Sequence, residues 1–344
     1  MAVGLSQRVA SLSGRVQWVV GVALLVAFLA VPQVYGSYQT GLAVELLVLL
    51  LFAASYDLLI GYTGVVSFGH ALPYGAAAYA MGMAMTGRPL PLIPEAGVSF
   101  PVAVGIALFA VVIISLITGW LAFRLSGVYF AVLTLAFSMV GYYAVFESTE
   151  FTGGDNGMLV TRPDLLGLPL SDYVTYYYFT LWIVLVSFLL MRRLTNSPFG
   201  RVLVSIRENE DRARFLGYDT NHYKLAVFVV AGLFAGVAGI LQGLYLNILT
   251  PNMMYWSTGG DALLVTLIGG MGTLWGVIFG AVFLLGAREL LTGFIEGWPI
   301  VLGVVYVLFV LFVPDGIAGF LTDRSRSAWD VVSDLRGSDE SDES

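Results

Sequence analysis

The chain has 344 residues, of which 58% are hydrophobic and only 11% are charged, and its mean hydropathy is +0.86. Soluble proteins carry about 25% charged residues, so this composition indicates an integral membrane protein. The lack of cysteine excludes disulfides, thiolate catalysis, zinc ribbons and iron–sulfur clusters, and two distant histidines, His70 and His222, argue against a histidine-rich metal site.

Apolar runs recur along almost the whole length, as expected for many bilayer-spanning segments. The alternating ten-residue segments of a barrel are absent, so the spans are predicted to be helices. The expected fold is an all-α polytopic membrane protein with about ten transmembrane helices, some short or broken, and possible internal duplication. Residues 1–16 are expected to be a cytoplasmic N-terminus and residues 17–314 the membrane domain. The predicted spans are 17–32, 42–60, 71–86, 101–123, 128–146, 173–191, 224–246, 260–271, 275–287 and 298–313.

Basic residues in the loops predict the orientation. Seven lie between positions 192 and 224, whereas residues 147–172 contain only Arg162. By the positive-inside rule the 192–223 loop is cytoplasmic and the 147–172 loop is external. Arg8 and Arg15 place the N-terminus in the cytoplasm, and an even number of spans returns the C-terminus there. Residues 1–36 also resemble a signal peptide, but no A-x-A cleavage site follows, so we expect them to be retained as the first span.

Net charge is concentrated near the C-terminus. Of the net −7, residues 315–344 contribute eight carboxylates and three arginines, which leaves −2 for the rest. We predict a mostly disordered acidic cytoplasmic tail over 315–344. The chain has one lysine, Lys224, against fifteen arginines; this bias is expected in a halophile and is also produced by GC-rich coding.

Two glycine-interrupted regions occupy comparable places in the two halves. They are "GYTGVVSFGHALPYGAAAYA" at 61–80 and "LIGGMGTLWGVIFGAVFLLG" at 267–286. Paired interrupted segments are typical of a duplicated transporter whose pathway lies where the halves meet. Glycines at such spacing also serve plain helix packing, and His70 alone is more often structural than a proton carrier. The predicted pathway residues are Asp57, Gly61, Gly64, Ser67, Gly69, His70, Asp261, Gly269, Gly270 and Gly272.

Carboxylates within or beside spans are candidate functional groups. Most of them fall near span ends, where solvation explains them equally well. Asp57 and Asp261 adjoin the interrupted regions and are therefore the two that we retain. The full set is Glu45, Asp57, Asp261, Glu289 and Glu296.

Catalytic motifs are absent from the sequence. A phosphate-binding loop needs a lysine after glycine, and Lys224 follows Tyr223, so this chain is not its own ATPase. No nucleophile elbow or H-E-x-x-H motif occurs, and we expect neither an enzyme nor a cofactor. The cytoplasmic stretch "RENEDRARFLGYD" places Ala213, Leu216 and Gly217 at i, i+3 and i+4, which predicts a short amphipathic helix, either solvated or docked in a partner's groove.

Several ordered blocks resemble the branched-chain amino acid ABC importer permeases of the LivM type. They are the 61–80 stretch, "RLSGVYFAVLTLAF", "TGGDNGM", the segment from "SPFGRVLVSIRENEDRARFLGYD" into the next helix, and "LIGGMGTLWGVIFGA". The resemblance implies a second homologous permease of the LivH type, two ATPase subunits, an external binding protein and a multi-pass place in the cell membrane, with no nucleic acid partner. It also implies that the ATPase stroke reaches a coupling loop containing Arg207, Glu208, Asp211, Arg212, Leu216 and Gly217, with Lys224 opening the next helix.

The expected function is therefore ATP-driven import of branched-chain amino acids, with hydrolysis in separate subunits. Asp57 departs from the family's usual Asn, and Val277 stands where Pro commonly follows Gly276. Urea and short-chain amide importers use very similar permeases and remain an alternative. A second alternative is an ion-gradient transporter that uses Asp57, His70 and Asp261, and a third is a scaffold subunit without a pathway.

Overall fold

The computed structural model describes residues 26–87, 97–165, 167–293, 297–312 and 316–317. Most of this part is helical, and the strands are two-residue pieces, so the predicted all-α class is confirmed. The helices are α3 Ser37–Thr63, α4 Ala71–Thr86, α5 Phe100–Ala122, α6 Val128–Glu147, α7 Thr149–Thr152, α8 Tyr173–Thr195, α9 Pro198–Glu208, α10 Glu210–Phe215, α11 Thr220–Leu246, α12 Trp256–Gly269, α13 Gly276–Thr292 and α14 Trp298–Phe312. The predicted N-terminus 1–16 lies outside the described residues, and so does the tail apart from residues 316–317.

Five described helices are long and apolar enough to cross a bilayer, namely α3, α5, α6, α8 and α11. By contrast, α4, α12, α13 and α14 have 16, 14, 17 and 15 residues, fewer than the ~20 that a straight span requires. The short segments predicted at 71–86, 260–271 and 275–287 therefore fall on short helices. Of the first predicted span, residues 26–32 are helical, and residues 17–25 lie outside the described residues.

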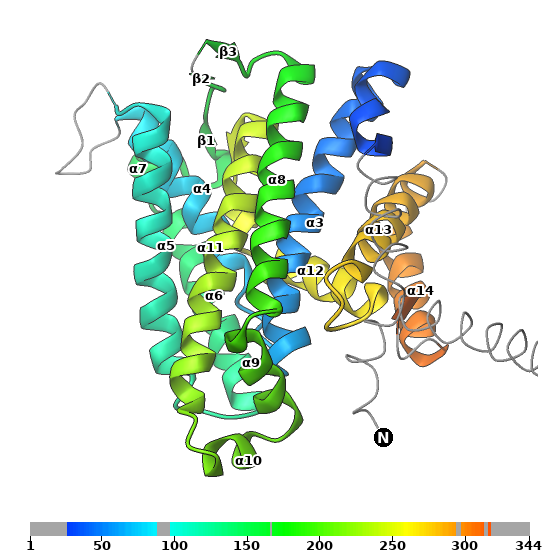
Figure 1. Cartoon of the computed structure of the whole chain (residues 1–344). Coiled ribbons are helices and arrows are strands. Elements are labelled where there is room, and N and C mark those ends of the chain that lie inside the picture. Colours follow the sequence, from blue (N-terminus) through cyan, green and yellow to red (C-terminus); the bar gives the residue numbers. More distant parts are fainter. Residues whose placement is uncertain (1–25, 88–96, 166, 294–296, 313–315, 318–344) are drawn as a thin grey trace, which may run out of the picture.

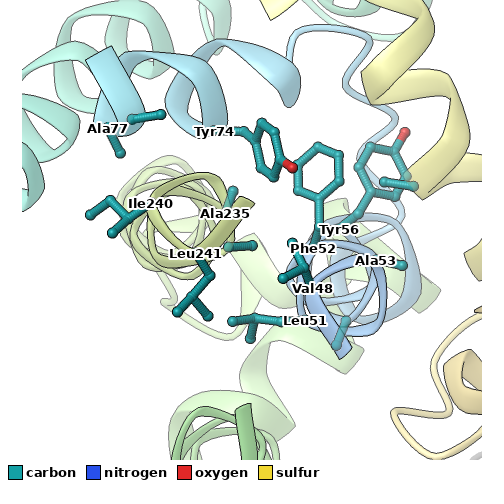
Figure 2. Packing of buried hydrophobic residues seen from close by; sticks show 14 of the residues in the cluster. Val48, Leu51, Phe52, Ala53, Tyr56, Tyr74, Ala77, Ala235, Ile240 and Leu241 are labelled. Carbon is teal, nitrogen blue, oxygen red and sulfur yellow. The ribbon is translucent and has the colours of Figure 1, made fainter. Parts of the chain in front are cut away.

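Helices α3, α4 and α11 form the centre of the described structure. The apolar window of α3 is 83% buried, whereas those of α5 and α6 are 28% buried. The outer side chains of α5 are nevertheless apolar, as a lipid-facing surface requires. Figure 2 shows Phe52 of α3 beside Tyr74 of α4, with their ring centres 4.4 Å apart, next to α11. These three helices form the scaffold that positions both interrupted segments.

Glycine allows α11 to approach α4 closely. A methyl group at Gly239 would overlap the backbone carbonyl of Tyr74, and one at Gly236 would press on Ala77 and on Val111 of α5. Small residues at this spacing let helix backbones approach in membranes. The glycines of α11 therefore serve helix packing.

Two ends of the molecule are distinct. Short antiparallel pairs lie at one end: β1 (Met158–Leu159) with β4 (Ile248–Leu249), and β2 (Asp164–Leu165) with β3 (Leu168–Pro169). Here Arg162 donates hydrogen bonds to the carbonyls of Leu244 and Tyr245 at 2.8 and 2.7 Å, which satisfies the C-terminal end of α11. The short helices α9 and α10 lie at the opposite end (Figure 1).

Candidate functional site

The first interrupted segment is a break between two helices. Helix α3 continues to Thr63 and ends at Gly64, whose φ of +72° is the left-handed conformation common at helix ends. Helix α4 begins at Ala71, so Pro73 lies in its first turn, where its missing N–H removes no helical hydrogen bond. The glycines and the proline thus mark a helix end and a helix start.

The second interrupted segment is also a break between helices. Helix α12 ends at Gly269, and α13 begins at Gly276. Between them Gly270 and Gly272 have φ values of +107° and +78°, which side chains rarely adopt. At Gly269 a methyl group would overlap the carbonyl of Gly276, so the two helices approach too closely there for any other residue.

The two breaks meet at one point, which we call the Asp57 junction and define as Asp57, Gly61, Gly272 and Arg207. Asp57 Oδ1 accepts a hydrogen bond from the backbone N–H of Gly272 at 2.7 Å. Gly61 leaves the space for this contact, because a methyl group there would overlap both Asp57 and Gly272. Arg207 of α9 donates to the carbonyl of Gly61. The junction thus joins three predicted pathway residues to one predicted coupling residue.

Asp57 is an incompletely satisfied buried carboxylate. It is fully buried, and its Oδ2 has no hydrogen-bond partner among the described residues. The guanidinium of Arg207 lies near enough to interact with it electrostatically, but no ion pair within 4.0 Å joins them in the described structure. A buried carboxylate is costly without hydrogen bonds and a close cation, so an amide should suit this place at least as well.

We expect Asp57→Asn to preserve stability and Asp57→Leu to reduce it. The amide oxygen of Asn retains the bond from Gly272 and removes the buried charge, whereas Leu leaves that N–H unpaired, at a cost of about 1–3 kcal/mol. Thermal unfolding in detergent, followed by tryptophan fluorescence, measures both variants. An Asn variant that unfolds as easily as the Leu variant would contradict this account. An Asp57→Asn variant that keeps full stability but loses leucine uptake would instead support the ion-gradient alternative.

His70 and Ser67 lie between the helices rather than in an open path. His70 is 2% exposed, and its Nε2 lies 2.8 Å from Ser55 Oγ. Because Ser55 Oγ donates to the Phe52 carbonyl at 2.6 Å, the His70 Nε2–H is the donor to Ser55. Phe52 and Tyr56 flank the imidazole ring. Ser67 is also buried, and its hydroxyl has no partner among the described residues.

Of the remaining predicted pathway residues, one lies beside the Asp57 junction and two lie away from it. Gly64 lies beside the Arg207 side chain, and Gly69 packs so closely on α6 that a methyl group would overlap the Thr134 carbonyl. Asp261 of α12 has different electrostatic neighbours, Arg288 and Glu45. It therefore belongs to another group of charges, and Glu296 lies outside the described residues. The pathway role of the whole set stays a prediction.

The loop between α8 and α11 is a compact helical unit. Helix α8 continues to Thr195 and α11 begins at Thr220, so the predicted loop 192–223 is shorter than expected. The apolar side of α9 is buried and, with Ala213 of α10, forms a small separate core of Val202, Ile206 and Ala213. Asn209 caps α10 by accepting from the Arg212 N–H at 2.8 Å.

The predicted apolar face of the α10 region is wrong in detail. The helix ends at Phe215, and Gly217 has a φ of +91°, so Leu216 and Gly217 lie beyond it. Ala213 faces inward, whereas Leu216 is 72% exposed. Phe215, which the sequence pattern did not indicate, is 91% exposed and follows Arg212 and Arg214 in the motif. We call Phe215 and Leu216 the apolar tip. The other predicted coupling residues nearby, Glu208, Asp211 and Arg212, are exposed.

Glu210 connects α10 to the start of α11. Its Oε1 lies 2.6 Å from Lys224 Nζ and also accepts from Thr220 at 3.0 Å. Partial burial raises the pKa of Glu210, but the hydrogen bond and charge of Lys224, with smaller effects of Thr220 and Arg214, outweigh it, and the pKa lies below its usual 4.5. Lys224, which the resemblance placed at the helix start, therefore holds α10 against α11.

We expect acid to loosen α10. Because the folded-state pKa of Glu210 is lowered, its stabilising effect is complete above about pH 4.5 and is lost as the pH falls through the folded pKa. Hydrogen exchange of the α10 amides, corrected for intrinsic rates, should accelerate below pH 4.5 in the wild type. In Glu210→Gln, exchange should be faster at pH 7 and should change less with pH. Identical pH profiles for the two proteins would contradict this role.

The fold and the site define the class of protein: a multi-pass α-helical membrane protein in which the helix α9 of a loop contacts two helix breaks. Residues 38–313 match the family described as the branched-chain amino acid transport system permease component. The chain belongs to that family, and the predicted resemblance is confirmed.

Individual relatives agree with this assignment. The chain is 27% identical to the high-affinity branched-chain amino acid permease LivM of Escherichia coli, over 86% of this chain and 73% of that protein. A probable LivM of Methanocaldococcus jannaschii is 25% identical over 75% of this chain and 84% of its own length. The permease LivH of Salmonella typhimurium is 29% identical over 43% of this chain and 49% of its own. No solved structure gives a significant match.

Proposed function

We propose that this protein is the permease subunit of an ATP-driven importer that moves branched-chain amino acids from an external binding protein to the cytoplasm. Family membership supports the substrate class. The observation that carries the mechanism is the Asp57 junction, where Arg207 of α9 reaches the carbonyl of Gly61 at the end of α3 and Asp57 bonds Gly272. A movement of α9 therefore reaches both helix breaks through direct contacts.

The energy comes from separate ATPase subunits, because the sequence lacks a phosphate-binding loop. The apolar tip is the proposed docking point. Phe215 and Leu216 are 91% and 72% exposed next to the charged residues Asp211 and Arg212, and exposed apolar residues with a polar rim are typical of protein interfaces. In this proposal α9 and α10 are cytoplasmic, an orientation that the seven basic residues of positions 192–224 support.

The strand-bearing end then faces outward and receives the binding protein, and both chain termini are cytoplasmic in the cell membrane. A LivH-type permease is the proposed second membrane subunit, since this chain also shares sequence with that relative. The two interrupted segments alternate between closed and open arrangements as α9 moves. In this proposal the buried positions of Asp57 and His70 correspond to the closed arrangement.

The test is uptake of labelled leucine in cells with and without this gene, with ATP depletion compared with an ionophore. The proposal predicts uptake that needs the gene and ATP but survives collapse of ion gradients. Excess valine and isoleucine should compete, whereas urea and acetamide should not. Competition by urea or acetamide would favour the amide importers, and uptake that fails with the gradient while ATP stays high would establish a secondary transporter instead.

A further inference from the structure

A second group of charged residues surrounds a cavity at the end opposite α10. The cavity has a volume of about 440 Å³, and its lining includes Tyr38 and Glu45 of α3, Tyr245 of α11 and Glu289 of α13. The N-terminal part of α3 lies at this end, near α13 (Figure 1). The volume is within the range of small-molecule sites, about 300–1,000 Å³.

Carboxylates outnumber cations around this cavity. Glu45 Oε1 lies 4.0 Å from Arg288 Nη1, and the hydroxyl of Tyr38 donates to Glu289. Asp261 interacts electrostatically with both Arg288 and Glu45. Among the described residues of this group, the carboxylates of Glu45, Glu289 and Asp261 outnumber the one guanidinium, that of Arg288.

Glu45 in particular is poorly partnered for its position. It lies about two turns into the membrane-spanning helix α3, and its only described ion pair is the contact with Arg288 at the 4.0 Å limit. A carboxylate inside a membrane protein is costly unless a cation or hydrogen-bond donors satisfy it. Its side chain is 37% exposed, so the carboxylate is accessible to a cationic group that enters the cavity.

The rest of the lining suits a small organic molecule more than a bare metal ion. Aromatic rings come from Tyr38, Tyr173 and Tyr245, and Leu42 adds an apolar side chain. The faces of such rings attract ammonium groups, and the rings also offer apolar area to an aliphatic side chain. No cluster of three potential metal ligands occurs among the described residues.

We propose that this cavity is a binding site for the primary ammonium group of an amino acid on its way into the permease, with Glu45 and Glu289 as the acceptors. The inference rests on the proposed function, because it takes the amino acid class from it. The ammonium group supplies three donors and a second positive charge to this carboxylate-rich group of residues. Leu42 and the tyrosine rings contact the aliphatic part of the ligand.

The site is tested by direct binding of labelled leucine to the purified permease complex in nanodiscs without binding protein. We expect saturable binding that weakens about tenfold in Glu45→Gln and in Glu289→Gln, the loss typical of one charge-assisted hydrogen bond. Glu150→Gln is the matched control, because Glu150 is an exposed carboxylate of α7 at the same end, and it should bind as the wild type does. Tyr38→Phe, which keeps every charge and removes only the bond to Glu289, should weaken binding less.

Competition with leucine analogues separates ligand recognition from a structural role. Leucinamide retains the ammonium group and should compete, whereas 4-methylpentanoate lacks it and should not. Absence of saturable leucine binding, equal competition by both analogues, or unchanged binding in both Gln variants would overturn the inference. Gene- and ATP-dependent uptake in cells would stand in any of these cases, so failure of this site is distinguishable from failure of the proposed function.

Discussion

Replacement of both Phe215 and Leu216 by Asp is expected to abolish leucine uptake and to leave the membrane fold intact. Both side chains are largely exposed, by 91% and 72%, so the change costs the folded permease little, within about 0.5 kcal/mol. At an interface, however, buried aromatic anchors dominate the binding energy, and the loss of one costs about 2–4 kcal/mol. Two negative charges in the proposed interface with the ATPase subunit should therefore reduce leucine uptake at least 100-fold.

The measurement combines uptake with co-purification of the ATPase subunits. Phe215→Leu with Leu216→Met should retain both, because an apolar tip of similar size remains. Leu159→Asp is the second control, since Leu159 is 75% exposed on β1 at the opposite end, and it should leave co-purification unchanged. Wild-type co-purification and uptake in the double Asp variant would show that the ATPase stroke enters elsewhere.

The charged neighbours of the tip are expected to behave differently. Asp211, whose side chain is 83% exposed, and Arg212 lie at the rim of the proposed interface. Rim charges mainly affect association rate and salt dependence, so joint replacement by Ala should weaken coupling of ATPase activity to transport most at low salt. The protein should remain inserted, and unchanged uptake at every salt concentration would count against a role for these two residues.

Gly239→Ala is expected to destabilise the membrane domain by about 1–3 kcal/mol, the range for overpacking a close contact. The new methyl group would overlap the Tyr74 carbonyl of α4, and a backbone carbonyl moves only if the helix moves. Because α4 begins within the first interrupted segment, displacement of α4 should also reduce uptake. Loss of stability and loss of transport should therefore occur together.

Gly105→Ala is the matched control for that experiment. Gly105 is also within a helix, on α5, but a methyl group there meets no atom within 4 Å. Alanine is intrinsically the better helix former by about 1 kcal/mol, so Gly105→Ala should equal or exceed the wild type in thermal unfolding in detergent. Equal unfolding temperatures for the two variants would show that α4 and α11 separate without cost.

The positions of most helices followed from the sequence alone. Helix α4 begins and ends where it was predicted, at 71 and 86, because glycines precede and follow an apolar run and a proline marks its first turn. The break between α12 and α13 was likewise evident from its glycines. In both cases the signal is local: glycine and proline act on the backbone at their own positions, whatever lies around them.

The contacts of the candidate site were decided by tertiary structure. Asp57 and Gly272 lie 215 positions apart, and no local pattern indicates that Arg207 joins them or that Glu45 and Glu289 share a cavity. The burial of Ala213 and the exposure of Phe215 could not be predicted either, because α10 is too short to show a clear hydrophobic periodicity. In a membrane the difficulty is general, since α5, whose apolar window is 28% buried, is at least as apolar as α3, whose window is 83% buried. Hydrophobicity therefore determined which segments enter the bilayer, whereas close packing at glycines and a few buried hydrogen bonds decided which of them meet.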